Sequence, residues 1–271
     1  MILIEGVSKS YTQKQFFKKA KHIQAVNNVT LTIQEGSCFG LLGQSGSGKS
    51  TLGKMLLGIE KPDVGSIHFH EINIHEATHN EKRFLQHALQ VVFQDCHSAV
   101  NPKMKIRDII AEPLCVHQKM TKDEINKRVS DLLEMVGLQA TDMMKYPHQF
   151  SGGQLQRITI ARAISTKPNL IVLDESINSL DLLVQINILK LLKKLQRELN
   201  LTYLFITHDL HAVKLIADEI AIMYQGEIVE KTTVDQLNNV QHEASKALLA
   251  AQLPTDCIHN YLTPSTKEQV S

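Results

Sequence analysis

A glycine-rich loop is the first group of residues whose types and spacing could do chemistry. Residues 43–50, GQSGSGKS, fit G-x-x-x-x-G-K-S, follow the apolar run 39–42 and precede the helical run TLGKMLLGI. Glycines let backbone N–H groups close around a phosphate, and the dipole of the following helix adds to the attraction. Lys49 is predicted to contact the β- and γ-phosphates, and the Ser50 hydroxyl to ligate Mg²⁺. The other predicted loop contacts come from Gly43, Gln44, Ser45, Gly46, Ser47, Gly48 and Thr51. The alternative is a Gly/Ser-rich turn without a ligand.

Two carboxylates close the apolar run LIVLDE at residues 170–175. At the carboxyl end of a parallel strand beside a phosphate loop, Asp174 would hold the Mg²⁺ shell and Glu175 would polarise the attacking water. Taken alone, the pair could also be solvated acids that end a strand.

Two further side chains follow apolar runs that would end at the same rim. His208 ends FITHD and is expected to hydrogen-bond the γ-phosphate, although a lone histidine at a strand end is often structural. Gln94 ends QVVFQ, and its neutral amide could reach both the metal and the water.

A second anion-binding pattern lies about a hundred residues after the first. In FSGGQLQRITIARA, residues 150–163, Ser151 is a plausible helix N-cap and the two glycines permit close backbone approach. We call Ser151, Gly152, Gly153 and Gln154 the signature segment. An ordinary capped helix is the alternative for this segment by itself.

The surrounding pattern specifies elements that could position these residues. Short strand-like runs (ILIEGV, VTLTI, SCFGLLG, QVVFQD, LIVLDE, LTYLFITHD) alternate with helical runs, and EIAIMYQGEIVE is typical of a hairpin. This predicts an α/β fold with a mainly parallel sheet, preceded by a strand-rich N-terminal part. Residues 101–144 are helical in texture, with Thr121 as N-cap, Glu124 three residues on and Gly137 as a stop. The helix 185–199 should bury Ile188, Leu191, Leu192, Leu195 and Leu199.

Composition narrows the function classes. Lys+Arg 29 against Asp+Glu 28 gives a net charge of +1, so no overall basic field argues for nucleic acid. The four cysteines form no CxxC pair, which favours a reducing compartment. Neither a signal peptide nor an apolar run near the ~20 residues of a membrane span is visible. If the protein works at a membrane, other chains would span it.

The motifs together resemble the ATP-binding cassette (ABC) ATPases, in the order phosphate loop, Gln94, signature segment, Asp174-Glu175, Ser179-Leu180-Asp181 and His208. The resemblance implies a P-loop cassette over residues 1–253 that binds ATP and Mg²⁺, with a helical subdomain at about 95–150 and a polar tail at 254–271. It also implies that two cassettes pair head to tail, so the signature segment acts on the other chain's nucleotide. Tyr11 would stack on adenine, Asp181 would lie in the dimer-communicating loop, and Gln94 would be the hinge of the subdomain.

A narrower resemblance rests on QDCHSAVNPKMKI and YPHQFSGGQLQR, which are similar to the branch serving peptide and nickel importers. KHIQAVNNVTLTI and DESINSLDLLVQINIL favour the nickel members, which also lack the usual proline at the position of Ser176. The resemblance implies two permeases, a sibling ATPase in a favoured heterodimer, a substrate-binding protein, and a peripheral place on the cytoplasmic face of the bacterial inner membrane. The alternatives are a dipeptide or oligopeptide importer, a non-transport ABC ATPase, and a kinase-like P-loop fold.

Histidines at positions 68, 70, 75 and 79 raise the possibility of metal binding, because nickel favours imidazole. Strand alternation would place His68 and His70 on one face of an edge hairpin. His75 and His79 have the i,i+4 spacing of a helix, but no third ligand is evident. We expect solvated surface histidines, and metal selection by other chains.

Overall fold

A six-stranded sheet carries the segments that end in the candidate site residues. The computed structural model describes residues 1–13, 21–93, 95–117, 120–176 and 181–251. The strand order is β10-β9-β3-β8-β7-β6, in which all neighbours are parallel except the β9–β10 hairpin. The strands are β3 (Cys38–Leu42), β6 (Leu89–Val92), β7 (Leu170–Asp174), β8 (Thr202–Thr207), β9 (Glu219–Tyr224) and β10 (Glu227–Thr233). The predicted α/β fold with a mainly parallel sheet is confirmed.

The N-terminal part forms a separate antiparallel sheet of order β2-β1-β4-β5. Its strands are β1 (Ile2–Gln13), β2 (Lys21–Ile33), β4 (Val64–Phe69) and β5 (Ile72–Asn73). The expected hairpin at 64–73 forms, but the edge prediction is wrong for β4, because β1 pairs along its other side. Of the two strands of this hairpin, only the two-residue β5 lies at an edge of the sheet.

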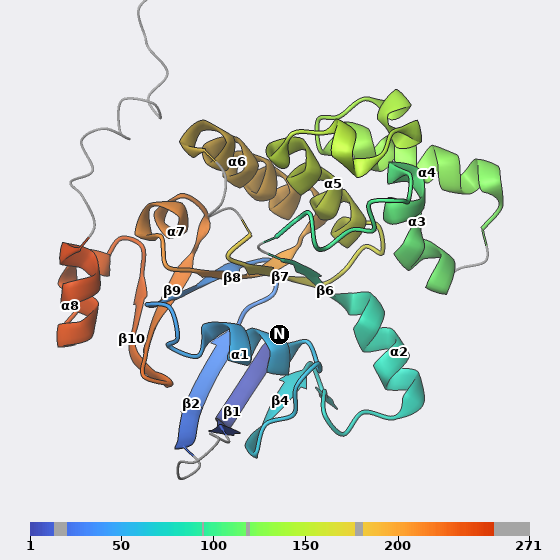
Figure 1. Cartoon of the computed structure of the whole chain (residues 1–271). Coiled ribbons are helices and arrows are strands. Elements are labelled where there is room, and N and C mark those ends of the chain that lie inside the picture. The colour runs from blue at the N-terminus through green and yellow to red at the C-terminus, as the bar shows by residue number, and fades with distance from the viewer. Residues whose placement is uncertain (14–20, 94, 118–119, 177–180, 252–271) are drawn as a thin grey trace, which may run out of the picture.

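Helices cover the parallel sheet on both faces. Figure 1 shows α5 and α6 above it, with α1 and the antiparallel sheet below. The helices are α1 (Lys49–Leu56), α2 (His79–Ala88), α3 (Ile106–His117), α4 (Lys122–Met135), α5 (Gly152–Ile164), α6 (Leu182–Leu199), α7 (Leu210–Ile216) and α8 (Glu243–Ala250). Short 3-10 helices span Ala140–Met144, Pro147–Gln149 and Leu237–Asn239.

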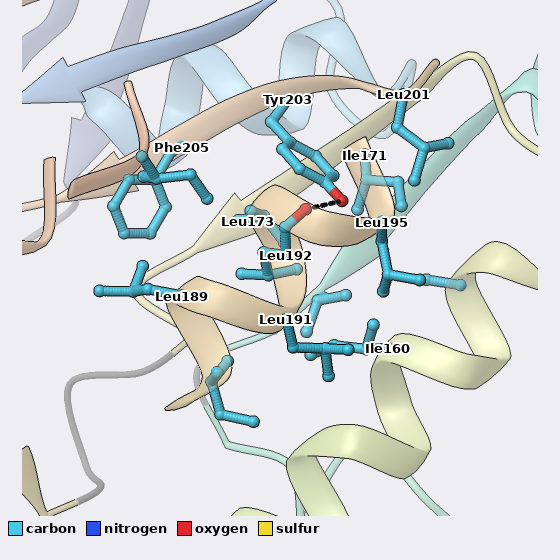
Figure 2. Close-up of a cluster of buried hydrophobic side chains, with 14 of the residues drawn as sticks. Ile160, Ile171, Leu173, Leu189, Leu191, Leu192, Leu195, Leu201, Tyr203 and Phe205 are labelled. Carbon is cyan, nitrogen blue, oxygen red and sulfur yellow. Dashed lines mark hydrogen bonds between the residues drawn. The ribbon is translucent and has the colours of Figure 1, made fainter. Parts of the chain in front are cut away.

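The two faces of the sheet bury two distinct cores, because successive side chains of a strand point to opposite faces. In β7, Val172 packs in the core that contains α1, whereas Ile171 and Leu173 pack in the core that contains α5 and α6. Figure 2 shows the leucines of α6 between the sheet and Ile160 of α5, with the Tyr203 hydroxyl donating to the Leu192 carbonyl at 3.1 Å. The sheet therefore separates α1 from α5.

Sequence signals for the helix ends are mostly confirmed. Thr121 and Glu124 form a capping box at the start of α4, and Gly137 follows its end with φ +77°. Leu199 departs from the predicted buried face, since at the last turn of α6 it is 39% exposed.

The clustered histidines do not form a helical pair. Thr78 caps α2, which begins at His79, so His75 lies outside the helix and the i,i+4 prediction is wrong. His68 and His70 lie near Glu5 and Glu35, at 3.8 and 3.0 Å. His75 is half-buried, and burial lowers its pKa. Across the described parts of the chain, no group of three or more His, Cys, Asp or Glu side chains is placed to hold a metal ion.

No helix in the described portion is long and apolar enough to cross a membrane.

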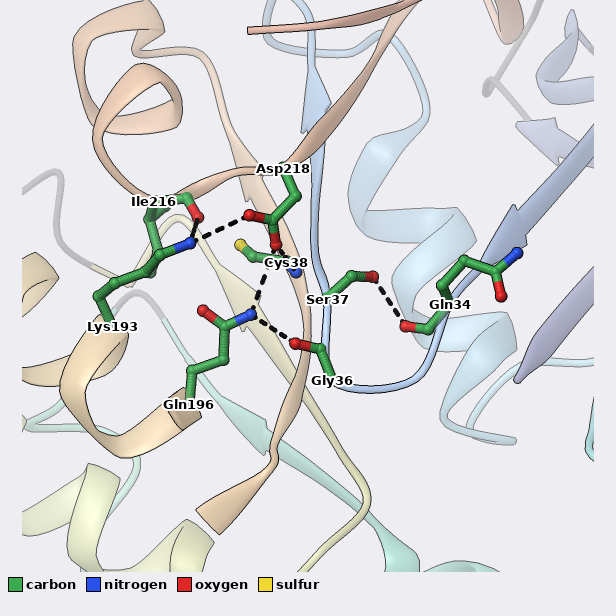
Figure 3. A network of polar contacts seen from close by, with 8 residues as sticks. All are labelled: Gln34, Gly36, Ser37, Cys38, Lys193, Gln196, Ile216 and Asp218. Atoms are coloured by element: carbon green, nitrogen blue, oxygen red, sulfur yellow. Dashed lines mark hydrogen bonds and ion pairs between the residues drawn. The ribbon is translucent and has the colours of Figure 1, made fainter. Parts of the chain in front are cut away.

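A polar network ties the start of β3 to the last turns of α6 (Figure 3). Asp218, just before β9, accepts from the Cys38 backbone N–H at 2.7 Å and from Lys193 at 3.1 Å, while Gln196 donates to the Gly36 carbonyl at 2.8 Å. Burial alone would raise the pKa of Asp218, but the bonds from Cys38 and Lys193 outweigh it, so the pKa is lowered.

Replacing Asp218 by Asn should lower the melting temperature at pH 7, because the network loses its charge. A carboxyl whose pKa is lower in the folded state stabilises fully above its unfolded pKa of about 3.9 and loses this effect as pH falls through the folded value. The difference in melting temperature between wild type and variant should therefore shrink in acid. The exposed Asp235 provides the matched control, Asp235→Asn, and an equal effect of both variants at pH 7 would contradict the assignment.

Candidate functional site

The glycine-rich loop connects β3 to α1 and is closed around the ammonium group of Lys49. That buried group donates to the carbonyls of Gly43 and Gln44, both at 2.8 Å, and to Ser47 Oγ at 3.3 Å. Burial lowers the pKa of Lys49, and the nearby Glu175 and Asp174 carboxylates oppose this effect. A positive charge is thus held at the N-terminus of a helix, an arrangement that attracts phosphate.

Two positions of this loop require glycine. Gly48 has φ +106°, and a Cβ there would collide with the Ala25 carbonyl. A Cβ at Gly43 would collide with the Met223 carbonyl and approach Ser47 Oγ to 2.8 Å. The backbone can therefore pass close to its neighbours only because both side chains are absent.

An oxygen cluster suited to Mg²⁺ lies beside the loop. Ser50, in the first turn of α1, donates from its hydroxyl to Asp174 Oδ1 at 3.0 Å, at the end of β7. Burial raises the pKa of Asp174, and the bond from Ser50 opposes the rise. Hydroxyl and carboxylate oxygens are the ligands that Mg²⁺ prefers, so the residues fit the ion.

Glu175 and His208 meet where β7 and β8 end. The register pairs Asp174 with Ile206, and the Glu175 N–H donates to the Ile206 carbonyl at 2.9 Å. Glu175 has φ +46°, a left-handed conformation that costs energy in a non-glycine residue. In this backbone conformation, Glu175 Oε1 lies 3.6 Å from His208 Nδ1. Two of the predicted catalytic side chains, Glu175 and His208, thus lie close together at this rim.

The structure also brings Tyr11 to this site from the antiparallel sheet. Its hydroxyl interacts with the side chains of Glu60 and of Thr51 in α1. Burial is the main reason that the pKa of Tyr11 is raised. Tyr11 is 38% exposed, and the centroid of its ring lies 5.9 Å from Lys9 Nζ. An exposed aromatic face beside the loop is suited to stacking on a nucleobase.

The signature segment lies at the N-terminus of α5, across the sheet from α1 (Figure 1). Ser151 Oγ accepts from the Gln154 N–H at 3.3 Å, and Gln154 Oε1 accepts from the Ser151 N–H at 3.0 Å, which confirms the predicted cap. Gly153 packs against Val184 of α6, whose N–H donates to the capping Asp181 carboxylate at 3.0 Å.

The predicted site residues therefore fall into two groups. Lys49, Ser50, Asp174, Glu175 and His208 come together with Tyr11, whereas the signature segment and Asp181 form a second group around the start of α6. Gln94 and Ser179-Leu180 lie outside the described residues.

A groove beside the end of β6 was not anticipated from the sequence. It has a volume of about 310 Å³, and its walls include Phe93 and, from α3, Pro113 and Val116. Phe93 is 43% and Val116 64% exposed. The only local signal for this groove was the apolar Phe93 immediately before Gln94. From strand alternation alone, Phe93 would be predicted to lie in the core.

Comparison with known proteins agrees with this arrangement. The family model described as ABC transporter matches residues 26–178. The oligopeptide transport ATP-binding protein OppF of Streptococcus mutans is 44% identical over 236 residues, covering 86% of this chain and 76% of that protein. The nickel import ATP-binding protein NikE of Rhodospirillum rubrum is 42% identical over 256 residues, covering 94% and 92%.

A solved structure matches as well. The dimeric post-hydrolysis state of the ATP-binding cassette MJ0796, bound to ADP and Pi, is superimposed with a TM-score of 0.76 at 29% identity, covering 86% of this chain and 99% of that one. The fold is that of an ATP-binding cassette. The chain belongs to the ABC transporter family, in its peptide and nickel import branch.

Proposed function

We propose that this chain is an ATP-hydrolysing subunit of an importer that carries nickel across the bacterial inner membrane. The observation that carries the ATPase assignment is the convergence of Lys49, Ser50, Asp174, Glu175 and His208 at the ends of β3, β7 and β8. The OppF and NikE relatives support the transport assignment.

In the proposed reaction, Lys49 leaves its loop carbonyls and binds the β- and γ-phosphates of ATP. The Glu175 carboxylate accepts a hydrogen bond from the attacking water and aligns it with the γ-phosphorus. As the water oxygen bonds to the γ-phosphorus, its proton passes to Glu175, the bond from phosphorus to the β–γ bridging oxygen breaks, and ADP and inorganic phosphate are formed. His208 donates a hydrogen bond to the γ-phosphate. Ser50 and Asp174, with Gln94 as a further ligand, would hold Mg²⁺, which would supply neutralisation of the negative charge that develops on the phosphates.

The signature segment belongs, in this proposal, to the nucleotide site of a second cassette. Its position across the sheet from α1 favours action on another chain, and the solved relative is dimeric. Exposed N–H groups at the start of α5 would then contact a γ-phosphate held by the partner. We favour a sibling ATPase over a second copy, with Asp181 at the junction.

We further propose that residues 1–253 form the cassette domain and that the subdomain at about 95–150 docks on the permeases. The groove beside β6 would receive an apolar helix from a permease, because Phe93 and Val116 leave apolar surface exposed there. This contact, together with a separate substrate-binding protein, would place the chain peripherally on the cytoplasmic face of the membrane.

Cargo is the finer part of the proposal. NikE supports nickel, and the sequence run around Ser176, which lacks the usual proline, agrees with it. OppF, slightly more identical over fewer residues, supports oligopeptides as the second candidate. Metal selection would lie in the binding protein and the permeases.

Uptake in a strain lacking this gene decides between them. We expect accumulation of radioactive ⁶³Ni²⁺ to fall at least about tenfold and to return with the wild-type gene but not with Lys49→Ala, while labelled tri- to pentapeptides enter normally. Loss of peptide uptake with normal nickel uptake would transfer the assignment to oligopeptides. Normal uptake of both would refute the importer proposal for these cargoes.

A further inference from the structure

Arg162, in the last turn of α5, holds two separate segments at once. One guanidinium nitrogen, Nη1, donates to the Ala99 carbonyl at 3.0 Å, and the other, Nη2, donates to Glu112 Oε2 of α3 at 2.7 Å. The side chain is 34% exposed. A planar guanidinium presents several donors in fixed directions, which suits it to bridging two separate acceptors.

Both acceptor residues, Ala99 and Glu112, line the groove beside β6, which we call the docking groove, and so does Arg162 itself. Ala99 ends a turn that begins at Asp95, where the Ala99 N–H donates to the Asp95 carbonyl at 3.1 Å. The turn starts directly after position 94. Glu112 lines the groove together with Pro113 and Val116, which follow it in α3. Displacement of α3 or of this turn would therefore pull on Arg162.

Arg162 shares a continuous helix with the signature segment. α5 runs without interruption from Gly152 to Ile164, and its capping residue is Ser151. A second arginine of the same helix, Arg157, donates to the Val136 carbonyl at 2.6 Å, just after α4. Because a helix with a buried apolar face moves as a unit, movement at one end is transmitted to the other.

We propose that Arg162 is a positioning residue that links the docking groove to the signature segment, so that engagement of a permease sets where Ser151 and Gly153 stand. The proposal rests on the docking function proposed above, and it deepens it by naming the residue through which the groove acts. Because its hydrogen bonds go to Ala99 and Glu112, Arg162 acts through α5.

Hydrogen exchange of the isolated full-length chain tests the linkage without a permease. In Arg162→Met we expect the amides of residues 95–99 and of Gln154 and Leu155 to exchange about tenfold faster, while those of β8 stay unchanged. Arg107→Met is the matched control, because Arg107 donates within α3 to the adjacent Asp108, and it should leave both segments unchanged. Faster exchange at 95–99 alone, or at neither segment, would overturn the proposal.

A partial variant guards against a folding defect in Arg162→Met. Glu112→Gln keeps an acceptor for Nη2 but removes its charge, so both segments should respond in the same direction by a smaller factor. If the amides of β8 also exchange faster in Arg162→Met, the exchange rates of Glu112→Gln become the deciding measurement. A Gln154 amide that is as protected in Glu112→Gln as in wild type then refutes the linkage.

A second arm measures ATP turnover with the permeases in proteoliposomes. Arg162→Met should still copurify with the permeases and keep its KM for ATP within about twofold, but lose most of the rise in kcat that the loaded binding protein causes. Val116→Glu serves as the reference for lost docking and should not copurify. Full stimulation of Arg162→Met would contradict the linkage. Absence of stimulation in wild type would instead count against the importer function, and the exchange arm would still decide on Arg162.

Discussion

A chain with Glu175→Gln should bind ATP as tightly as wild type and hydrolyse it about 10²–10⁴-fold more slowly, the range expected for loss of a catalytic base. The side chain keeps its size and its position at the end of β7, so the binding contacts of Lys49 remain. The amide, however, accepts hydrogen bonds weakly and cannot polarise the attacking water as a carboxylate does. Equilibrium binding of radioactive ATP and steady-state phosphate release give the two quantities.

Glu198→Gln is the matched control for this variant. Glu198 lies on the outer surface of α6, 3.8 Å from Lys194, so its neutralisation should leave turnover unchanged. If Glu175→Gln hydrolyses ATP at the wild-type steady-state rate, Glu175 does not polarise the attacking water. Loss of ATP binding would show instead that the left-handed backbone at this position, φ +46°, does not tolerate the change.

Mixing two inactive variants should restore activity if the chain can pair with a second copy and the signature segment acts across that dimer. Lys49→Ala removes the phosphate-loop cation, and Ser151→Arg places a bulky cation at the cap of α5. In a mixed dimer, one site combines the intact loop of the second chain with the intact signature segment of the first. Random pairing of equal amounts should therefore recover about one quarter of wild-type turnover, since half of the dimers carry one working site of two.

The same variants also distinguish a homodimer from a heterodimer. If the chain pairs only with a sibling ATPase, mixing the two variants restores no activity. The experiment is then photolabelling of the heterodimer with azido-ATP. Lys49→Ala should then abolish vanadate-trapped label on this chain, and Ser151→Arg should abolish it on the sibling. Trapping lost on this chain in Ser151→Arg, with the sibling unaffected, would place the signature segment at its own chain's nucleotide.

Much of the site could be predicted from sequence because its signals are local. The spacing of Gly43, Gly48 and Lys49 defines a loop, and the end of an apolar run places Glu175 at a sheet rim without knowledge of the partner strands. The roles of Ser151 and Thr121 as helix caps could be predicted in the same way, since a capping box depends on a residue only three positions away. Parallel strands then bring these rims together.

Features that depend on non-local pairing were less accessible. The sequence near His68 alternates as an edge strand would, and only the long-range register with β1 makes β4 interior. Phe93 is apolar and would be expected in the core, but it follows Val92, the last residue of β6. Its exposure depends on how α3 packs beside it. Arg162 occurs in a basic helical run like many solvated arginines, and nothing local indicates that Ala99 and Glu112 face it.

The contact between Gly153 and Val184 limits how cassettes of this type can be recombined. A Cβ at Gly153 would stand 2.5 Å from a methyl group of Val184, so the sizes of these two residues are mutually constrained although they lie 31 positions apart in the chain. A chimera that takes the start of α5 from one cassette and the start of α6 from another inherits this steric dependence. Segments exchanged between related cassettes would have to include both helices or keep the sizes of these two residues matched.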